Sequence, residues 1–256
     1  MMPVLFIGHG SPMNATQKNS YTKNLENLVS KLKEPKAILV ISAHWQSRGT
    51  FVTSAKAPEQ IYDFYGFPKE LYEIEYHPPG NPELAKEIAE FLKHDGALTT
   101  EEWGLDHGAW AVLLHIYPKA EIPVLQLSMD INLSPEEKME IGSKLHELRK
   151  KDVLILGSGN IVHNLRLADF HHPEIPPYEW AIEFDRYVRE ALIERNDLAI
   201  LEYSKVGEAA KLSVPTTEHF DPIFYVLGSM GRDEKIEFIH EGFEHKSISM
   251  RSFMSI

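Results

Sequence analysis

Residues Lys36–Trp45 read KAILVISAHW, and the predicted architecture can be built outward from this segment. Ala37–Ile41 is a continuous apolar run rich in β-branched side chains, which is typical of a strand buried on both faces of a parallel sheet. His44 follows this strand directly. Ligands of open α/β sheets bind outside the carboxyl ends of the strands, so His44 lies where a metal-competent side chain would act. Taken alone, His44 is also compatible with a partly buried imidazole at a capped strand end.

The same arrangement occurs twice more in the chain. The apolar strand Pro3–Ile7 ends at GHGSP, which carries His9, and the apolar strand Val153–Leu156 runs into GSGNIVHN, which carries His163. Because the carboxyl ends of neighbouring parallel strands meet at one edge of a sheet, we expect these histidines to lie near His44. Several imidazoles at one edge indicate a metal site better than any one of them alone.

Helical and extended patterns alternate along the whole sequence. Helices are predicted over 21–33, 82–93, the segment ending at 117, 135–150, 178–194 and 223–227, and further strands over 97–100, 122–127 and 198–201. Two short strands, antiparallel at a sheet edge, are expected after Lys235, and a loop over 169–177. Asn81 with Pro82 and the pair Ser134 and Glu137 are helix-start signals. The alternation predicts α/β class: one three-layer α/β/α domain over residues 1–256 with a central mixed, largely parallel sheet.

Two more histidines lie in polar or turn-rich surroundings. His107 sits between Asp106 and Gly108, on what we expect to be a tight connection and not a helix face. His219 follows Glu218 in the segment PTTEHFDP. The aromatic, irregular segment 62–68 is compatible with a wall or lid for a flat apolar substrate. It is equally compatible with a small core under a long loop.

The composition excludes several classes of protein. The formal charge of −12 argues against a nucleic-acid partner, because such a partner requires a basic face. No apolar stretch approaches the roughly 20 residues that span a bilayer, and the N-terminus lacks the features of a secretory signal. There are no cysteines, so disulfides and thiolate metal sites are absent. We therefore expect a cytoplasmic protein; whether it forms a homo-oligomer stays open.

An imidazole-rich site without thiols suits Zn, Fe(II), Cu or Ni better than Mg or Ca. Three histidines can hold zinc, and two histidines with a carboxylate are typical of non-haem Fe(II) oxygenases. The sequence has neither an HExxH helix nor a GxSxG elbow, which removes two hydrolase signatures. The GSGN turn does not fit a dinucleotide fingerprint, because its third glycine would fall on Val162.

Six motifs in consistent order resemble the class III extradiol ring-cleavage dioxygenases, in particular their DOPA 4,5-dioxygenase branch. They are HGSP at His9, SAHW at His44, YDFYGFP at 62–68, GLDHGAW around His107, GSGNIVHNL at His163 and TTEHFDP at His219. The resemblance implies a single α/β/α domain. It also implies an oxidoreductase of aromatic compound metabolism that uses Fe(II) and O2 to open a catechol ring beside its two hydroxyls.

The resemblance also implies roles for individual residues. His9, His44 and His219 would be the metal ligands, with Glu218 as an alternative ligand. His163 would be the catalytic acid/base, and His107 a hydrogen-bond donor to substrate or oxygen. The residues expected to contact the substrate are Ser11, Trp45, Tyr62, Phe64 and Phe67. Three neutral ligands also suit zinc, so Zn(II) can take the place of Fe(II) in purified protein.

Two other functions remain open at this point. The first is a zinc hydrolase of a small amide or ester, with a metal-bound water as nucleophile and His163 as base. The second is a non-catalytic binding protein on the same fold. Oxygen consumption with a catechol after Fe(II) loading would separate the dioxygenase from both alternatives.

Overall fold

The computed structural model describes residues 1–172 and 175–256. Within this part of the chain, eight strands form one mixed sheet in the order β4-β3-β5-β2-β6-β1-β10-β7. The strands are β1 (Val4–Gly8), β2 (Ala37–Ser47), β3 (Phe51–Thr53), β4 (Leu98–Thr100), β5 (Val124–Asp130), β6 (Val153–Gly159), β7 (Ile236–His240) and β10 (Ser252–Ser255). The central strands β5, β2, β6 and β1 are parallel, and antiparallel pairs occur toward both edges. The predicted α/β class with a mixed, largely parallel sheet is confirmed.

Strand β2 lies at the centre because its apolar run can be buried on both faces. Val40 belongs to one buried apolar cluster and Leu39 to the other. A strand whose side chains alternate between two covered faces produces this division. The pairing of β2 with β5 shifts in register between Ile41 and Gln46, and His44 lies in this irregular segment. The irregularity is therefore located where the strand presents the histidine.

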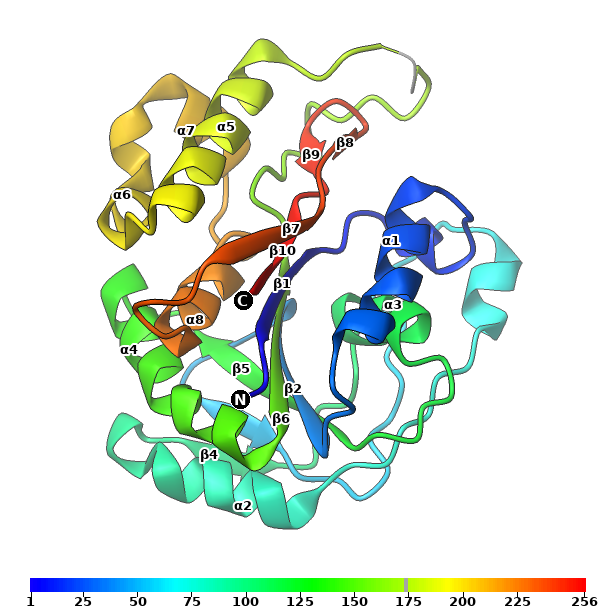
Figure 1. Cartoon of the computed structure of the whole chain (residues 1–256). Helices are drawn as coiled ribbons and strands as arrows, with labels where there is room; N and C mark the ends of the chain where they lie inside the picture. Colours follow the sequence, from blue (N-terminus) through cyan, green and yellow to red (C-terminus); the bar gives the residue numbers. More distant parts are fainter. Residues whose placement is uncertain (173–174) are drawn as a thin grey trace.

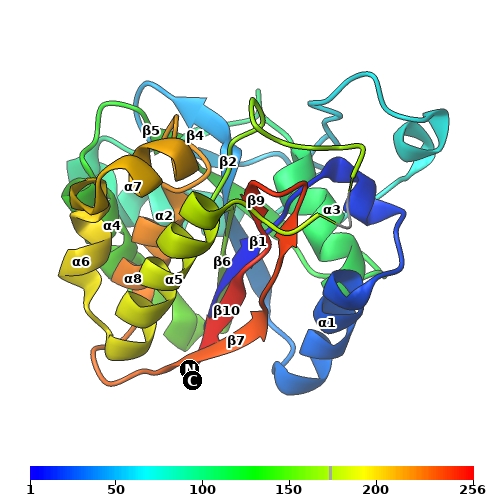
Figure 2. The same ribbon diagram turned by 90° about the horizontal axis from the view of Figure 1, so that it is seen from above.

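Helices cover both faces of the sheet, which gives three layers (Figures 1 and 2). One face carries α1 (Ser20–Leu28) and α3 (His107–Ile116). The other face carries α2 (Pro82–Phe91), α4 (Pro135–Leu145), α5 (Glu179–Glu194) and α8 (Pro222–Ser229), with the shorter α6 (Asp197–Leu201) and α7 (Glu208–Ser213) beside α5. The large apolar clusters fill the two spaces between sheet and helices. This is the layered arrangement that the alternating sequence predicted.

The strand predicted over 198–201 is wrong, because this segment forms α6. The Asn196 side chain accepts a hydrogen bond from the Ala199 backbone N–H and so caps the helix. Such a cap satisfies one of the backbone donors that a helix start leaves without a partner. Ile200 packs into the core from the single helical turn that follows. Four apolar residues are too few to distinguish strand from helix by periodicity.

The predicted position of His107 on a tight connection is also wrong, because His107 is the first residue of α3. Asp106 caps this helix and accepts a hydrogen bond from the Ala109 backbone N–H. The buried Asp106 carboxylate also accepts hydrogen bonds from Ser42 Oγ at 2.6 Å and Gln126 Nε2 at 2.7 Å. The start of α3 is thereby fixed to two strands of the sheet.

Three other sequence signals are confirmed. Asn81 caps α2 ahead of Pro82, and Ser134 and Glu137 form the capping box of α4. The segment after Lys235 supplies β7 at one sheet edge and β10 beside β1, with antiparallel pairing. Between them lies a small hairpin of β8 (Phe243–Glu244) and β9 (Ile248–Ser249). The predicted loop over 169–177 includes residues 173–174, which lie outside the described residues.

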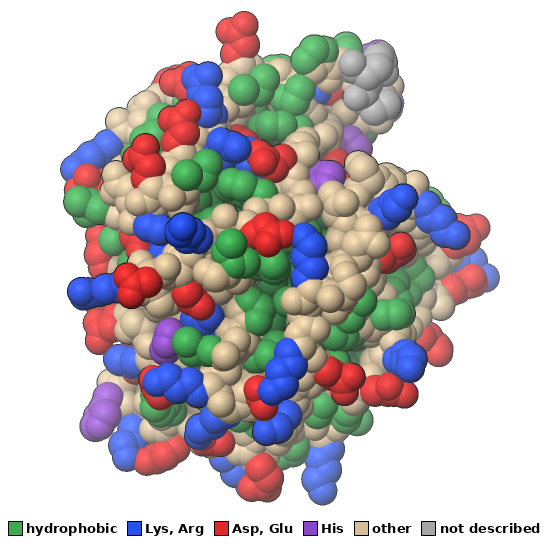
Figure 3. All heavy atoms as spheres, viewed as in Figure 1, with side chains coloured by type: hydrophobic (Ala, Val, Ile, Leu, Met, Phe, Trp, Pro, Cys, Tyr) green, Lys and Arg blue, Asp and Glu red, His purple; other side chains and the backbone are tan. Residues whose placement is uncertain are grey.

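The described helices include none that is both long enough and apolar enough to cross a bilayer. On the face shown in Figure 3, acidic and basic side chains are interspersed. This face therefore has no extended basic surface, as expected for a chain with a net charge of −12.

Candidate metal centre and active site

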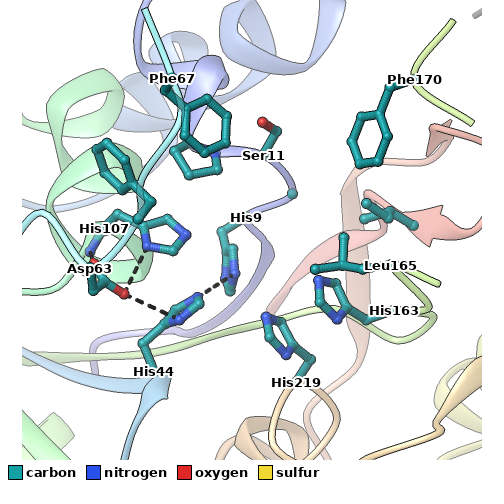
Figure 4. A pocket seen from close by; sticks show the side chains of 14 residues that line it. His9, Ser11, His44, Asp63, Phe67, His107, His163, Leu165, Phe170 and His219 are labelled. Carbon is teal, nitrogen blue, oxygen red and sulfur yellow. Dashed lines mark hydrogen bonds and ion pairs between the residues drawn. The ribbon is translucent and has the colours of Figure 1, made fainter. Parts of the chain in front are cut away.

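Five histidines from separate segments converge at the carboxyl edge of the sheet, where Figure 4 shows their rings around one cavity. His9 follows β1 and His44 lies in the irregular part of β2. His107 begins α3, His163 follows β6, and His219 precedes α8. We call these five residues the histidine cluster.

Three of these rings form a nearly equilateral triangle. The ring centroids of His9, His44 and His219 are 5.0 to 5.2 Å apart. One ligand atom from each ring lies within 4.8 Å of the others. The Nε2 atoms of His9 and His44 are 3.1 Å apart. Two nitrogens bound to one metal at about 2.1 Å are separated by roughly 3.0 to 3.4 Å, so this spacing fits a shared ion.

Neighbouring oxygen atoms favour a proton on Nδ1 of both His9 and His44. Ser158 Oγ donates to the Gly108 carbonyl at 2.6 Å, so at 3.0 Å it accepts a hydrogen bond from His9 Nδ1–H. The Asp63 carboxylate lies 3.2 Å from His44 Nδ1 and favours the proton on that nitrogen. Both rings can therefore present an unprotonated Nε2 to a metal.

The third ring follows the same pattern. His219 Nδ1 lies 3.2 Å from the Glu218 carboxylate, which accepts the Nδ1 proton and leaves Nε2 as the donor atom. Metal-binding histidines commonly hold their second nitrogen against an oxygen acceptor in this way. Glu218, considered as an alternative ligand, is therefore positioned to orient His219.

The Nε2 atoms of His9 and His44 lie 3.1 Å apart, close enough for a hydrogen bond when one of them carries a proton. When both are unprotonated, the same two atoms can bind one cation. The three neutral imidazoles thus fit a divalent transition metal by both geometry and chemistry.

The pKa values of the three candidate ligands are shifted in the direction that a metal site requires. Burial and the neighbouring imidazoles lower the pKa of His9 and of His219 well below the ordinary value. Burial and His107 lower the pKa of His44 to about 3. A neutral imidazole is the form that binds a metal, so these rings are available as ligands at neutral pH.

His163 stacks on His219, with ring centroids 3.5 Å apart and an interplanar angle of 9°. Its backbone N–H donates to the Ser213 carbonyl, which fixes the loop after β6. Burial lowers the pKa of His163 to about 4. The ring therefore lies against a candidate metal ligand in its neutral, proton-accepting form.

Asp63 connects two histidines and was not recognised from the sequence. Its Oδ2 accepts from His107 Nδ1–H at 2.9 Å and lies 3.2 Å from His44 Nδ1, and its Oδ1 accepts from the His107 backbone N–H. Burial raises the pKa of Asp63, but the hydrogen bonds from His107 outweigh this and hold the pKa below its ordinary value. The carboxylate is charged and orients both rings. The sequence feature that marks Asp63 is its position as an acidic residue inside the otherwise aromatic segment 62–68.

The loop that carries His219 is held by a close approach and a buried ion pair. A Cβ atom at Gly159 would come within 2.2 Å of the His219 carbonyl oxygen, so only glycine fits there. Asp221 pairs with the buried Lys138 at 2.7 Å and ties the loop to α4. The Gly-rich end of β6 thus allows this loop to pack closely against the strand.

The cavity beside the cluster has a volume of about 260 Å³. Ser11, Phe64 and Phe67 line it, together with Leu165 and Phe170, which sequence reasoning missed (Figure 4). The two missed residues lie in the loop after β6, and the sequence carries no periodic signal for which of its side chains turn inward.

Two residues expected to contact the substrate have their side chains elsewhere. Trp45 is buried and stacks on Trp103, with ring centroids 5.6 Å apart. Tyr62 donates its hydroxyl to the Ile74 carbonyl at 2.6 Å and packs against Trp110. Neither is among the described residues that line this cavity. The structure thus places Trp45 against Trp103 and Tyr62 against the wall residue Phe64.

Comparison with known proteins agrees with this geometry. Residues 3–254 match the family described as the catalytic LigB subunit of aromatic ring-opening dioxygenase. The chain is 43% identical over 258 residues to the 4,5-DOPA dioxygenase extradiol of Escherichia coli K12, covering 98% of this chain and 93% of the relative. It is 37% identical over 254 residues to the 4,5-DOPA dioxygenase extradiol of Beta vulgaris, covering 97% and 94%. A crystal structure of an Escherichia coli K12 protein superposes with a TM-score of 0.87 at 39% identity, covering 99% of both chains.

Proposed function

Because the chain belongs to the LigB family of aromatic ring-opening dioxygenases and is an extradiol enzyme, we propose that it uses Fe(II) and O2 to open a DOPA-like catechol. The observation that carries this proposal is the convergence of three imidazoles: the Nε2 atoms of His9 and His44 are 3.1 Å apart, and a His219 nitrogen lies within 4.8 Å of a ligand atom of each. The relatives named for DOPA support the choice of substrate.

His9, His44 and His219 would hold the iron through Nε2, since each Nδ1 faces an oxygen acceptor. When bound, iron supplies Lewis acidity toward the catechol hydroxyls and electrons toward O2. The same three ligands would also accept Zn(II), which has no redox chemistry, so zinc-loaded protein would not react with oxygen.

His163 would act as the general base toward a catechol hydroxyl. Its ring is neutral at physiological pH and lies against His219. A base must reach the proton that it removes, and a position beside a metal ligand places His163 next to a bound hydroxyl. After accepting the proton, the same ring can return it as a general acid.

His107 would hydrogen-bond to substrate or oxygen on the opposite side of the cavity. Its Nδ1–H is held by Asp63, so the ring is fixed in orientation and its Nε2 is the nitrogen left for the cavity.

The apolar wall would exclude water from the reacting groups. Phe64 and Phe67 pack edge to face, with ring centroids 5.4 Å apart, and Phe64 also contacts the His107 ring. Aromatic side chains commonly line pockets for flat apolar ligands. Ser11 lies at the same rim and offers a hydroxyl.

We further propose that residues 1–256 act as one catalytic domain in the cytoplasm. His9, His44 and His163 lie on or directly after strands of one sheet, and the helices α3 and α8, next to His107 and His219, pack on the same sheet. A cysteine-free chain suits a reducing compartment.

The test is oxygen uptake by metal-stripped protein that has been reloaded anaerobically with Fe(II) and then given DOPA in aerated buffer. We expect one O2 consumed per DOPA and a coloured ring-opened semialdehyde. Matched samples loaded with Zn(II) should bind catechol without consuming oxygen. Ester or amide hydrolysis by the zinc form, with no oxygen uptake by the iron form, would overturn the proposal.

A further inference from the structure

A second cavity adjoins the site and shares two of its lining residues. It has a volume of about 210 Å³, and His163 and Leu165 line both cavities. The larger cavity is mostly apolar apart from the histidine cluster and Asp63, whereas the second adds Asn164, Arg166, Thr216 and Glu218. A catechol side chain that leaves the ring beyond His163 would therefore enter polar surroundings.

The second cavity contains one cation and one anion. Arg166 is exposed, and no hydrogen bond or ion pair is recorded for it within residues 1–172 and 175–256. It is also the only lysine or arginine that lines either cavity in that part of the chain. An arginine guanidinium binds a carboxylate through two parallel hydrogen bonds. Arg166 is thus available for an anionic group of the substrate.

Glu218 offers the opposite charge in the same cavity. Its Oε1 accepts from Thr216 Oγ1 at 2.8 Å and from His219 Nδ1–H at 3.2 Å. Its second carboxylate oxygen has no hydrogen bond recorded among the described residues and can accept from an ammonium group. Asn164 is already engaged, since its side chain donates to the Leu212 carbonyl.

Resting on the proposed function, we infer that this second cavity binds the α-amino-acid end of the substrate, with the carboxylate at Arg166 and the ammonium at Glu218. A catechol with a single charged group would leave one of these two residues without a counterion. A zwitterion satisfies both. Arg166 is therefore the specificity-determining residue for a substrate side chain that carries a carboxylate.

The experiment compares four catechols on iron-loaded protein: DOPA, 3-(3,4-dihydroxyphenyl)propionate, dopamine and 4-methylcatechol. We expect DOPA to have the highest kcat/KM and 4-methylcatechol the lowest. Arg166→Met should lower kcat/KM about tenfold for the two substrates that carry a carboxylate, because it removes a charge-assisted pair at a partly exposed position. For dopamine and 4-methylcatechol, the change should stay within about twofold.

Arg186→Met is the matched control, because it makes the same substitution at an exposed arginine of α5. It should leave all four substrates unchanged. The advantage that the Arg166 guanidinium gives to DOPA should also shrink as salt is raised, since a partly exposed ion pair is screened. Equal losses on all four substrates in Arg166→Met would show a general structural effect and overturn the assignment.

Calorimetric binding of DOPA and 4-methylcatechol to zinc-loaded protein gives a readout that does not depend on turnover. Arg166→Met should weaken DOPA binding about tenfold and leave 4-methylcatechol binding unchanged. If no catechol is cleaved, the proposed function fails, and calorimetry still decides the present inference. If all four are cleaved equally and Arg166→Met alters neither binding nor turnover, only the present inference fails.

Discussion

The histidine cluster can be compared with a second group of polar side chains, which we call the arginine cluster: Arg251, Asp185 and Glu241. The charges of the two clusters are balanced in opposite ways. In the arginine cluster, Arg251 pairs with Asp185 from α5 and with Glu241 after β7. Burial lowers the pKa of Arg251, but the carboxylates outweigh this and raise it. Opposite charges satisfy one another, and the group needs nothing from outside the chain.

The histidine cluster has no such internal balance. Its rings oppose each other's protonation, and the Nε2 atoms of His9 and His44 lie 3.1 Å apart. The two carboxylates beside it, Asp63 and Glu218, face Nδ1 atoms of the rings. A buried group of neutral, metal-binding side chains is therefore a candidate ligand site, whereas a buried group whose charges already match is structural.

The largest effect is expected at a candidate metal ligand. His44→Ala removes one of three ligands, and we expect it to abolish metal binding and turnover together. Metal analysis after reloading and the oxygen electrode measure the two. His94→Ala, at an exposed position after α2, is the control and should change neither. Full metal content in His44→Ala would contradict the ligand assignment.

The next effect separates the base from the ligands. His163→Ala should keep its metal, because His163 stacks on a ligand ring without sharing the three-nitrogen triangle. Turnover should fall by about 10²- to 10⁴-fold, the usual contribution of a general base. The measurement is kcat at full metal occupancy. Normal turnover would show that His163 is not the base.

A smaller effect is expected from the residue that orients the rings. In Asp63→Asn, the side-chain Nδ2 would face the N–H groups of His44 and His107, and donor would oppose donor. Relieving this conflict moves the His44 proton toward Nε2, the ligand atom. We expect metal affinity or activity to fall by about 10- to 100-fold. Titration with metal and turnover at saturating metal distinguish the two, and Asp233→Asn on an exposed turn is the control.

The sequence predicts those features of the fold and of the histidine cluster that depend on local rules. Buried strands, helix caps and the order of the motifs follow from periodicity and residue type, and they bring His9, His44 and His163 to one edge. The role of Asp63 depends on a loop folding over α3, which is a long-range contact. The Trp45 side chain stacks on Trp103, more than fifty residues away, and no local pattern reports that. The strand expected over 198–201 is wrong because a cap before the segment favours a helix.

The smallest effect lies in the arginine cluster and should be confined to stability. Burial raises the pKa of Glu241, but hydrogen bonds from Arg251 and Arg189 outweigh this and hold it below its ordinary value. A carboxylate with a lowered folded-state pKa stabilises the fold above its unfolded pKa, and this stabilisation is lost as the pH falls through the folded-state value. At pH 7, Glu241→Gln should lower the free energy of unfolding by at most about 1 kcal/mol, since the side chain is largely exposed. In denaturant titrations, the difference from wild type should vanish well below pH 4, where the carboxylate is protonated in both states. Metal content and turnover should stay unchanged at pH 7, because the arginine cluster binds no metal. A loss of bound metal in Glu241→Gln would contradict the distinction between the two clusters.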